Sequence, residues 1–327
     1  MATSAEILRR IASQRAQMGA LDAQTLEAIA RVYGVMYERL AGDIDALVQA
    51  IGALENPTIA QVKSLPQYRR LLRHGTRELD AFGAYLNSTI GGAGSVGAEI
   101  GLQHSSELIT AMTGQRFVGL QKRVMTTLLE YLKPDGPLYV RLALITNGTI
   151  DRVIQQIVEG VGQGWNPRRI ASAIQDGFGG GLTDALRNTR TVQLYSYRDS
   201  ARANYMASGG IVTGWIWWAE LDGDTCMSCV AQHGTVHDLD ETLDDHYNGR
   251  CAALPYIPDF PLEAQTGAEW FDTLTPEAQA DMMGQEKHAA WQDGKFDLSQ
   301  LSEQKPSEVY GTMRGEASLA SLLAESE

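Results

Sequence analysis

Several features that mark common classes of protein are scarce or missing in this sequence. Only three cysteines occur among 327 residues, so a disulfide framework would leave one thiol unpaired. No apolar run approaches the length of a membrane-spanning helix, and the opening residues MATSAEILRRIASQ predict a helix rather than a secretion signal. We therefore expect a protein with no membrane partner that folds in a cytoplasm.

Motifs of several enzyme classes are also missing. The sequence contains no HExxH zinc-protease motif and no Gly-x-Ser-x-Gly nucleophile elbow. The zinc-deaminase order, His-x-Glu before Pro-Cys-x-x-Cys, does not occur, and no Gly-Lys-Ser/Thr follows the glycine-rich stretches. These absences favour a protein that is not an enzyme.

An excess of basic charge is lacking as well. The net charge is −13, and residues 220–251 carry eight acidic groups against one basic group. Residues 152–202 carry seven basic groups against four acidic ones, so we expect a basic face only from the arginines between Arg168 and Arg202. Free duplex DNA is therefore not the expected main partner, although contact with packaged DNA stays open.

The first half of the chain shows helical periodicity. Thr3 and Glu6 have the spacing of a capping box, which predicts a first helix ending near Gly19. A longer helix is predicted from Asp22 to about Leu54, because apolar residues recur there every three or four positions and an Asn-Pro pair follows. We interpret these apolar stripes as the core faces of helical hairpins.

Prolines and glycines divide the rest of this region. Thr58 is predicted to cap a short helix, and Pro66 is predicted to start a longer one. The small residues 90–97 fit either a flexible joint or a helix packed closely against a neighbour. Helix is expected to resume through 124–132 and to end at the Pro/Gly cluster 133–137, which predicts a domain boundary.

The next region predicts helices that lead into a strand. Residues 138–160 read as a helix, and Asn166 with the proline after it starts another. The glycines of 177–181 predict the end of that helix and a flexible connection, with Thr183 or Asp184 capping the following helix.

A tryptophan-rich segment follows these helices. Residues 211–219 alternate and are rich in β-branched and aromatic side chains, which predicts a strand with indoles on both faces. Residues 221–224 have turn chemistry, and Thr235 with Val236 predicts a short return strand.

All three cysteines lie close together after the predicted strand. Cys226 and Cys229 form a C-x2-C pair, the spacing at which two thiolates from one tight turn reach the same metal ion. His246 and Cys251 form a second short pair and complete the pattern C-x2-C-x16-H-x4-C. Four such donors close a tetrahedral Cys3His shell, so we predict one structural Zn²⁺ held by these residues.

Other assignments of this stretch remain open. His233 or His237 could replace the histidine of the second pair. A catalytic zinc with three protein ligands could activate water, with Glu241, Asp244 or Asp245 as general base, but a closed shell has no position for that water. A nucleic-acid-binding zinc module is a further alternative, which the acidity of the segment opposes.

The same residues carry a family resemblance. The tryptophan-rich strand, Asp-x-Asp-Thr-Cys-x-x-Cys, a His-Gly pair and an acidic stretch ending in His-x-x-x-x-Cys resemble phage head-morphogenesis proteins, the Mu F-like minor head proteins of tailed bacteriophages. The family usually ends in His-Pro-x-Cys-Arg-Cys, whereas residues 246–251 read His-Tyr-Asn-Gly-Arg-Cys. The resemblance covers about residues 150–262 and, more weakly, the helical half before them.

These observations predict an α+β protein that is mostly α. Elongated N-terminal helical hairpins are expected in 1–136, and a smaller head-morphogenesis domain with a short β-sheet and the zinc-knuckle-like Cys/His site is expected in 137–262. An acidic, partly ordered tail is expected in 263–327, with helices near 278–283 and 287–291. Its last dozen residues are expected to need a partner to order.

The resemblance implies a structural role in the virion. A protein of this family would be a minor capsid protein that acts in head assembly near the portal and, as a further option, in DNA packaging or delivery. Its partners would be the portal protein and the major capsid or scaffolding proteins, inside the phage head or at the portal vertex. The zinc-dependent hydrolase and the nucleic-acid-binding zinc module are the alternative functions.

Overall fold

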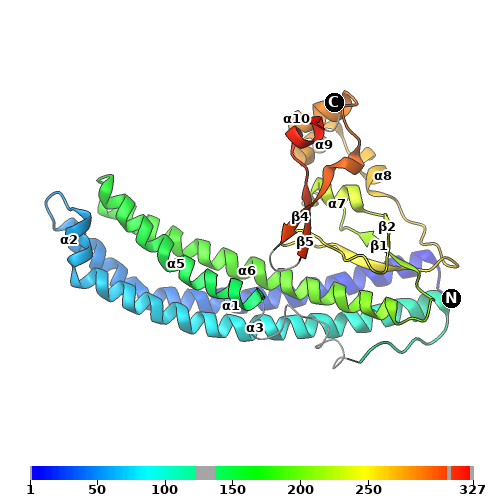
Figure 1. The fold of residues 1–327 in the computed structure, drawn as a ribbon, viewed down its shortest axis with the longest axis horizontal. Helices are drawn as coiled ribbons and strands as arrows, with labels where there is room; N and C mark the ends of the chain where they lie inside the picture. Colours follow the sequence, from blue (N-terminus) through cyan, green and yellow to red (C-terminus); the bar gives the residue numbers. More distant parts are fainter. Residues whose placement is uncertain (1, 122–136, 308–310, 325–327) are drawn as a thin grey trace. The chain divides into compact units, whose positions relative to one another are not determined.

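A computed structural model describes residues 2–121, 137–307 and 311–324 of the chain (Figure 1). Its elements are, in order, α1 Ser4–Gly52, α2 Ile59–Ser64, α3 Pro66–Thr113, α5 Pro137–Gly162, α6 Pro167–Met206, β1 Gly214–Trp218, α7 Met227–Gln232, β2 Val236–Asp238, β3 Ala252–Tyr256, α8 Gly267–Asp272, α9 Pro276–Met283, α10 Gln285–Gln292, the 3-10 helix η2 Leu298–Leu301, β4 Ser302–Ser307, β5 Gly311–Glu316 and α11 Leu319–Ala324. The protein is mostly helical with two small antiparallel sheets, which confirms the predicted α+β class.

The chain forms two compact units that interleave in sequence. The first unit comprises Met1–Gly19, Gly94–Tyr131 and Thr191–Glu327, and the second comprises Ala20–Ala93 and Leu132–Arg190. Helices α1, α3 and α6 each supply residues to both units. The expected helix 124–132 and the cluster 133–137 lie outside the described residues apart from Pro137, which begins α5, and the expected domain limits stay predictions.

Helix α1 is continuous where the sequence predicted two helices. Gly19 and Asp22 lie inside this 49-residue helix rather than at an end and a start. A single glycine in a helix costs about 1 kcal/mol relative to alanine, which the packing of so long a helix offsets. Asp22 does not cap a helix but accepts a hydrogen bond at 2.6 Å from Nε of Arg190 on α6, within the second unit.

The glycines of 177–181 also lie inside a helix. Helix α6 begins at Pro167 as predicted, with the backbone N–H of Arg169 donating to Asn166 Oδ1 at 3.0 Å. It then continues without a break, so the predicted flexible connection and the predicted cap at Thr183 or Asp184 are wrong. The reason is close packing, because a Cβ on Gly181 would lie 2.2 Å from the Oγ1 of a threonine on α5.

The small residues of α3 serve the same purpose in the first unit. Residues 90–97 are helical, which confirms the second of the two expectations for them. A Cβ on Gly97 would lie 2.4 Å from the carbonyl oxygen of Gln193 on α6, and one on Gly101 would lie 2.1 Å from Ser200 Oγ. Glycine lets the two helix backbones approach this closely.

The second unit is built from helical segments that pack on one another. The Tyr33 hydroxyl of α1 donates to the carbonyl of Phe178 on α6 at 2.7 Å, and its ring meets Phe82 of α3 edge-on at 4.9 Å. A Cβ on Gly75 of α3 would lie 3.1 Å from Ile150 of α5. The buried apolar residues of the expected stripes, including Ile29, Leu40 and Leu47 on α1 and Leu71, Leu79 and Leu86 on α3, form this core.

The first unit contains a three-stranded antiparallel sheet in the order β2-β1-β3. The predicted tryptophan strand forms the central strand β1, and the predicted return strand forms β2. Trp215 pairs with His237 on one side and with Pro255 on the other. Trp215 and Trp217 are fully buried, whereas Trp218 lies half-buried on the opposite face.

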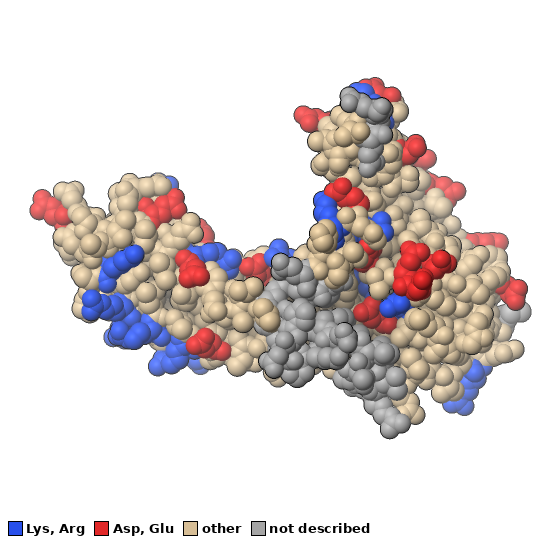
Figure 2. All heavy atoms as spheres, in the orientation of Figure 1, with Lys and Arg blue, Asp and Glu red and all other residues tan. Residues whose placement is uncertain are grey.

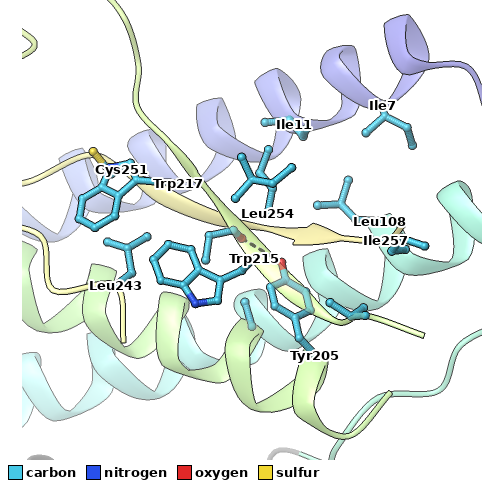
Figure 3. Close-up of a cluster of buried hydrophobic side chains, with 14 of the residues drawn as sticks. Ile7, Ile11, Leu108, Tyr205, Trp215, Trp217, Leu243, Cys251, Leu254 and Ile257 are labelled. Carbon is cyan, nitrogen blue, oxygen red and sulfur yellow. Dashed lines mark hydrogen bonds between the residues drawn. The ribbon is translucent and has the colours of Figure 1, made fainter. Parts of the chain in front are cut away.

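One face of this sheet lies in a hydrophobic core (Figure 3). Ile7 and Ile11 of α1, Leu108 of α3 and Tyr205 of α6 pack against the strand residues. The Tyr205 hydroxyl donates to the carbonyl of Ala253 at 2.9 Å, which fixes α6 to β3. Cys229 and Cys251 belong to the same cluster, so two of the predicted zinc ligands are part of this core.

The C-terminal segment is more structured than the sequence indicated. Helices α9 and α10 match the two helices predicted there. Strands β4 and β5 form an antiparallel hairpin that was not anticipated. Phe271, Phe296, Leu301 and Leu322 pack with Met227 of α7 in a second hydrophobic cluster, so residues 316–324, expected to need a partner, fold onto their own chain.

Candidate metal centre

The first pair of predicted ligands lies at the start of α7. Cys226 is the N-cap residue of this helix, and its Sγ accepts a hydrogen bond at 3.4 Å from the backbone N–H of Cys229. The turn before it is fixed by Asp222, which accepts hydrogen bonds from Thr225 Oγ1 and from the Asp224 N–H, both at 3.0 Å. This geometry aims both sulfur atoms to one side of the turn.

The second pair lies on the loop between β2 and β3. His246 Nε2 lies 3.2 Å from Cys226 Sγ and 3.4 Å from Cys229 Sγ. His246 Nδ1 lies 2.8 Å from the carbonyl of Tyr247 and can only donate to it, so in the neutral imidazole Nε2 is the atom left to bind a metal ion. Such a hydrogen bond commonly orients a metal-ligating histidine.

Cys251 completes the cluster from the position just before β3. Its Sγ, Cys229 Sγ and a carboxylate oxygen of Asp245 lie within 4.8 Å of one another, as do the donor atoms of Cys226, Cys229 and His246. Cys229 belongs to both groups and joins them. The structure therefore brings all four predicted ligands to one place.

An ion pair joins the two segments that carry the first and second pairs of predicted ligands. Arg250, which precedes Cys251, places its two terminal nitrogens 2.7 Å and 2.6 Å from the two carboxylate oxygens of Asp222, which precedes Cys226. These hydrogen bonds from Arg250 are the main reason that the pKa of Asp222 falls to about 2, although burial opposes the shift. The pair is partly exposed, so we assign it a role in positioning the loops rather than a large contribution to stability.

Two residues at the cluster, Asp245 and Arg198, have positions that the sequence did not predict, since Asp245 was considered only as a general base and Arg198 only as part of a basic face. Asp245 is fully buried, and one of its oxygens accepts from the His246 N–H at 2.9 Å. Its other oxygen accepts from Arg198 Nη2 at 2.8 Å and from the Cys251 N–H at 3.2 Å. Burial alone would raise the pKa of Asp245, but the Arg198 and His246 charges and these hydrogen bonds lower it.

Arg198 extends this network to the loop backbone. Its Nε donates to the Cys251 carbonyl at 2.7 Å, and its Nη2 also donates to the Gly249 carbonyl at 2.7 Å. Only 2% of its side chain is exposed, so the guanidinium is committed to these partners. Arg198 and Asp245 thus orient the loop that carries His246 and Cys251, as outer partners do around structural metal ions.

The thiols and the imidazole perturb one another strongly. The pKa of Cys226 falls to about 5, first because the Cys229 thiol donates to it and then because His246 donates to it and carries positive charge. The hydrogen bond that His246 donates to Cys226 is the largest cause that raises the pKa of His246 to about 10, against the effect of burial. The hydrogen bonds to Cys226 and Cys251, with burial, raise the pKa of the Cys229 thiol. A bound cation would replace the shared protons, because metal ligands must be deprotonated.

The two alternative histidines are engaged elsewhere. His233 is buried, its Nδ1 accepts from the Ala219 N–H at 3.0 Å, and its ring packs on Trp218 at 4.4 Å. His237 stacks on Trp215 at 4.3 Å and contacts side-chain oxygens through both ring nitrogens, with Thr235 Oγ1 at 2.8 Å and Glu241 Oε2 at 3.0 Å. The geometry therefore favours His246 as the nitrogen donor.

The donor set fits a zinc ion. Three sulfur atoms and one imidazole nitrogen form the combination that Zn²⁺ takes in structural sites. Cys229 and Cys251 are 4% and 3% exposed, and both sulfur atoms lie in the core beside the tryptophan strand. Asp245 also lies within reach of the sulfur atoms, but both of its oxygens already accept hydrogen bonds, so we assign it the role of an outer partner.

The C-terminal hairpin is anchored next to the cluster. Asp244 is 2% exposed, and its carboxylate accepts from Gln304 Nε2 of β4 at 2.7 Å and from Arg314 Nε of β5 at 3.1 Å. The Arg314 backbone N–H also donates to the Asp244 carbonyl. The guanidinium of Arg314 lies 5.8 Å from the centre of the Trp217 ring. The loop that carries His246 therefore also holds the hairpin.

Comparisons with known proteins found no match. No protein-family model, no curated protein and no solved structure matches this chain. Among the described residues, no helix combines the length and the apolar character that a bilayer-spanning segment needs. The buried Cys/His/Asp group that could hold a metal ion is thus the feature from which function can be argued.

Proposed function

We propose that this chain is a structural minor head protein of a tailed bacteriophage, with one zinc ion that pins its tryptophan-strand region. The observation that carries the proposal is the cluster of Cys226, Cys229, His246 and Cys251 directly behind the tryptophan strand. The order of these features along the chain resembles that of the Mu F-like minor head proteins. The zinc ion would supply binding energy for folding rather than chemistry.

The surroundings of the cluster support a structural metal. Cys226 and Cys229 come from the start of α7, and His246 and Cys251 come from the β2–β3 loop, so one ion would join two separate segments of the chain. The arrangement of Arg198 and Asp245 holds the loop in place around the donors. A catalytic site would instead require an open coordination position and a free base.

The three carboxylates considered as a general base all contact a basic side chain. Asp245 pairs with Arg198, Asp244 with Arg314, and Glu241 with His237. Asp244 and Asp245 are also buried. These contacts favour the structural assignment over the zinc-dependent hydrolase.

In the proposed role the protein assembles in the host cytoplasm and enters the phage head near the portal vertex. Its partners would be the portal protein and the major capsid or scaffolding proteins. Surface features available to them include the acidic segment around 238–241 and the half-buried Trp218 on the outer side of β1.

Virion incorporation tests this proposal. Virions produced from the phage genome that encodes the chain are purified on a density gradient and analysed by quantitative mass spectrometry. We expect the protein in the head fraction at fewer copies than the major capsid protein, and we expect the Cys229→Ser variant to be depleted. Its absence from virions and from proheads would contradict the proposal. A metal-dependent hydrolysis of model esters or phosphodiesters that depends on Cys229 would favour the hydrolase instead.

A further inference from the structure

The start of α3 carries an unusual run of charge. Between Glu55 and Glu78 the chain contains no acidic residue, while it contains one lysine and four arginines. The arginines are Arg69, Arg70, Arg73 and Arg77, which we call the arginine face. Residues 1–151 as a whole are nearly neutral, with 15 basic and 14 acidic groups, so this run is a local feature.

The helix places these arginines on its outer side. Arg69, Arg73 and Arg77 follow one another at four-residue intervals, so they lie above one another on one side of the helix, about 6 Å apart along its axis. The buried positions Tyr68 and Leu71 alternate with them and point into the second unit. Figure 2 shows basic side chains gathered along the lower left edge, over α3 and α1.

Little of this charge is neutralised. Within the part of the chain that the structure describes, Arg69 and Arg73 make no ion pair. Arg70 reaches Asp43 at 2.8 Å and Arg77 reaches Glu78 at 3.6 Å, but their side chains remain 75% and 73% exposed. The face therefore keeps a positive potential on a protein whose net charge is −13.

Three of the six arginines that the sequence had favoured for a basic face are engaged in ion pairs instead. Arg190 pairs with Asp22, and Arg187 pairs with Asp184, both within the second unit. Arg198 is buried against Asp245 in the first unit. Among the described residues, the arginine face of α3 is therefore a more exposed basic surface than the central part of α6.

We infer that the arginine face binds the phosphate backbone of duplex DNA without reading its sequence. Guanidinium groups match phosphate oxygens in geometry and charge, and a straight row of them suits a regularly charged strand. The outward positions of residues 66–77 offer no large apolar side chain, which a protein partner would need as an anchor. The inference rests on the proposed function, since a head protein meets packaged DNA.

Fluorescence anisotropy with the full-length protein and a labelled 30-base-pair duplex tests this inference. The wild-type protein should bind more weakly as NaCl rises from 50 to 200 mM, by about a hundredfold if four phosphates are contacted. The Arg69→Glu/Arg73→Glu variant should lose at least tenfold in affinity at 50 mM NaCl and show a salt dependence lower by about two contacts.

The matched control makes the same charge change elsewhere. Arg9 and Arg10 are exposed arginines of α1 in the other unit, and the Arg9→Glu/Arg10→Glu variant has the same net charge as the test variant. It should retain wild-type affinity to within about twofold, and circular dichroism should show all three proteins folded.

Three results would overturn the inference. These are no binding by wild-type protein at 50 mM NaCl, equal losses in the two variants, and preferential binding of an acidic polypeptide such as poly-glutamate over the duplex. None of these results affects virion incorporation, so failure here and failure of the proposed function can be distinguished.

Discussion

Replacement of Arg198 by methionine probes the network that orients the metal loop. Methionine keeps much of the length of the side chain and removes its charge. The variant loses the ion pair with Asp245 and the hydrogen bonds to the carbonyls of Gly249 and Cys251. Removing one partner of a buried ion pair typically costs about 3–5 kcal/mol, because the remaining charge is left in the protein interior.

We expect Arg198→Met to lower the free energy of unfolding by about 4 kcal/mol, since relaxation offsets part of the cost of the two unpaired carbonyls. Urea denaturation followed by tryptophan fluorescence reports on this unit directly, because Trp215 and Trp217 lie in the same core. Arg198→Lys retains the charge but not the fork of donors, so its loss should be smaller.

A double-mutant cycle separates the ion pair from general damage to the core. When Asp245→Asn is combined with Arg198→Met, the double variant should lose less stability than the sum of the two single variants. The account of this network fails if Arg198→Met costs less than about 1 kcal/mol, or if the two losses add to within about 0.5 kcal/mol.

Three further predictions concern other parts of the structure. Burial and then the charge of Arg15 lower the pKa of His233 from 6.5 to about 4. As pH falls from 6.5 to 4, this histidine is therefore protonated in the unfolded chain but stays neutral in the folded chain, which favours unfolding. About 3 kcal/mol of stability should be lost between pH 6.5 and 4, and urea denaturation should show that His233→Asn removes this pH dependence. Gly101→Ala should lower the melting temperature because its Cβ would clash with α6, whereas Gly92→Ala has open space and should be neutral or stabilising; equal melting temperatures would contradict the close packing. Asp244→Ala should release the β4–β5 hairpin, measured as faster limited proteolysis of residues 302–316, and unchanged cleavage would refute the anchoring role.

Much of the local structure could be predicted because its determinants are local. The Thr58 cap, the start of α6 after Asn166 and the tryptophan strand all follow from adjacent residues. The helix interruptions predicted at Gly19 and at 177–181 were wrong because packing against other helices outweighs the cost of glycine. That packing joins residues far apart in sequence and leaves no local signal.

The candidate metal centre shows the same division. Cys226, Cys229 and His246 could be grouped from their spacing alone. The sequence offered Asp245 only as one of three candidate general bases, and its partner Arg198 lies 47 residues away on α6. The burial of this ion pair depends on how the β2–β3 loop folds over α6, which spacing does not encode.

The central claim is that one zinc ion holds the Cys/His cluster together. Elemental analysis of purified, tag-free protein, with free-thiol counting alongside, tests it most directly. We expect one zinc per chain and three protected thiols, with zinc and stability lost together in Cys229→Ser. A metal-free wild-type protein whose three thiols react freely while it stays folded would contradict the claim.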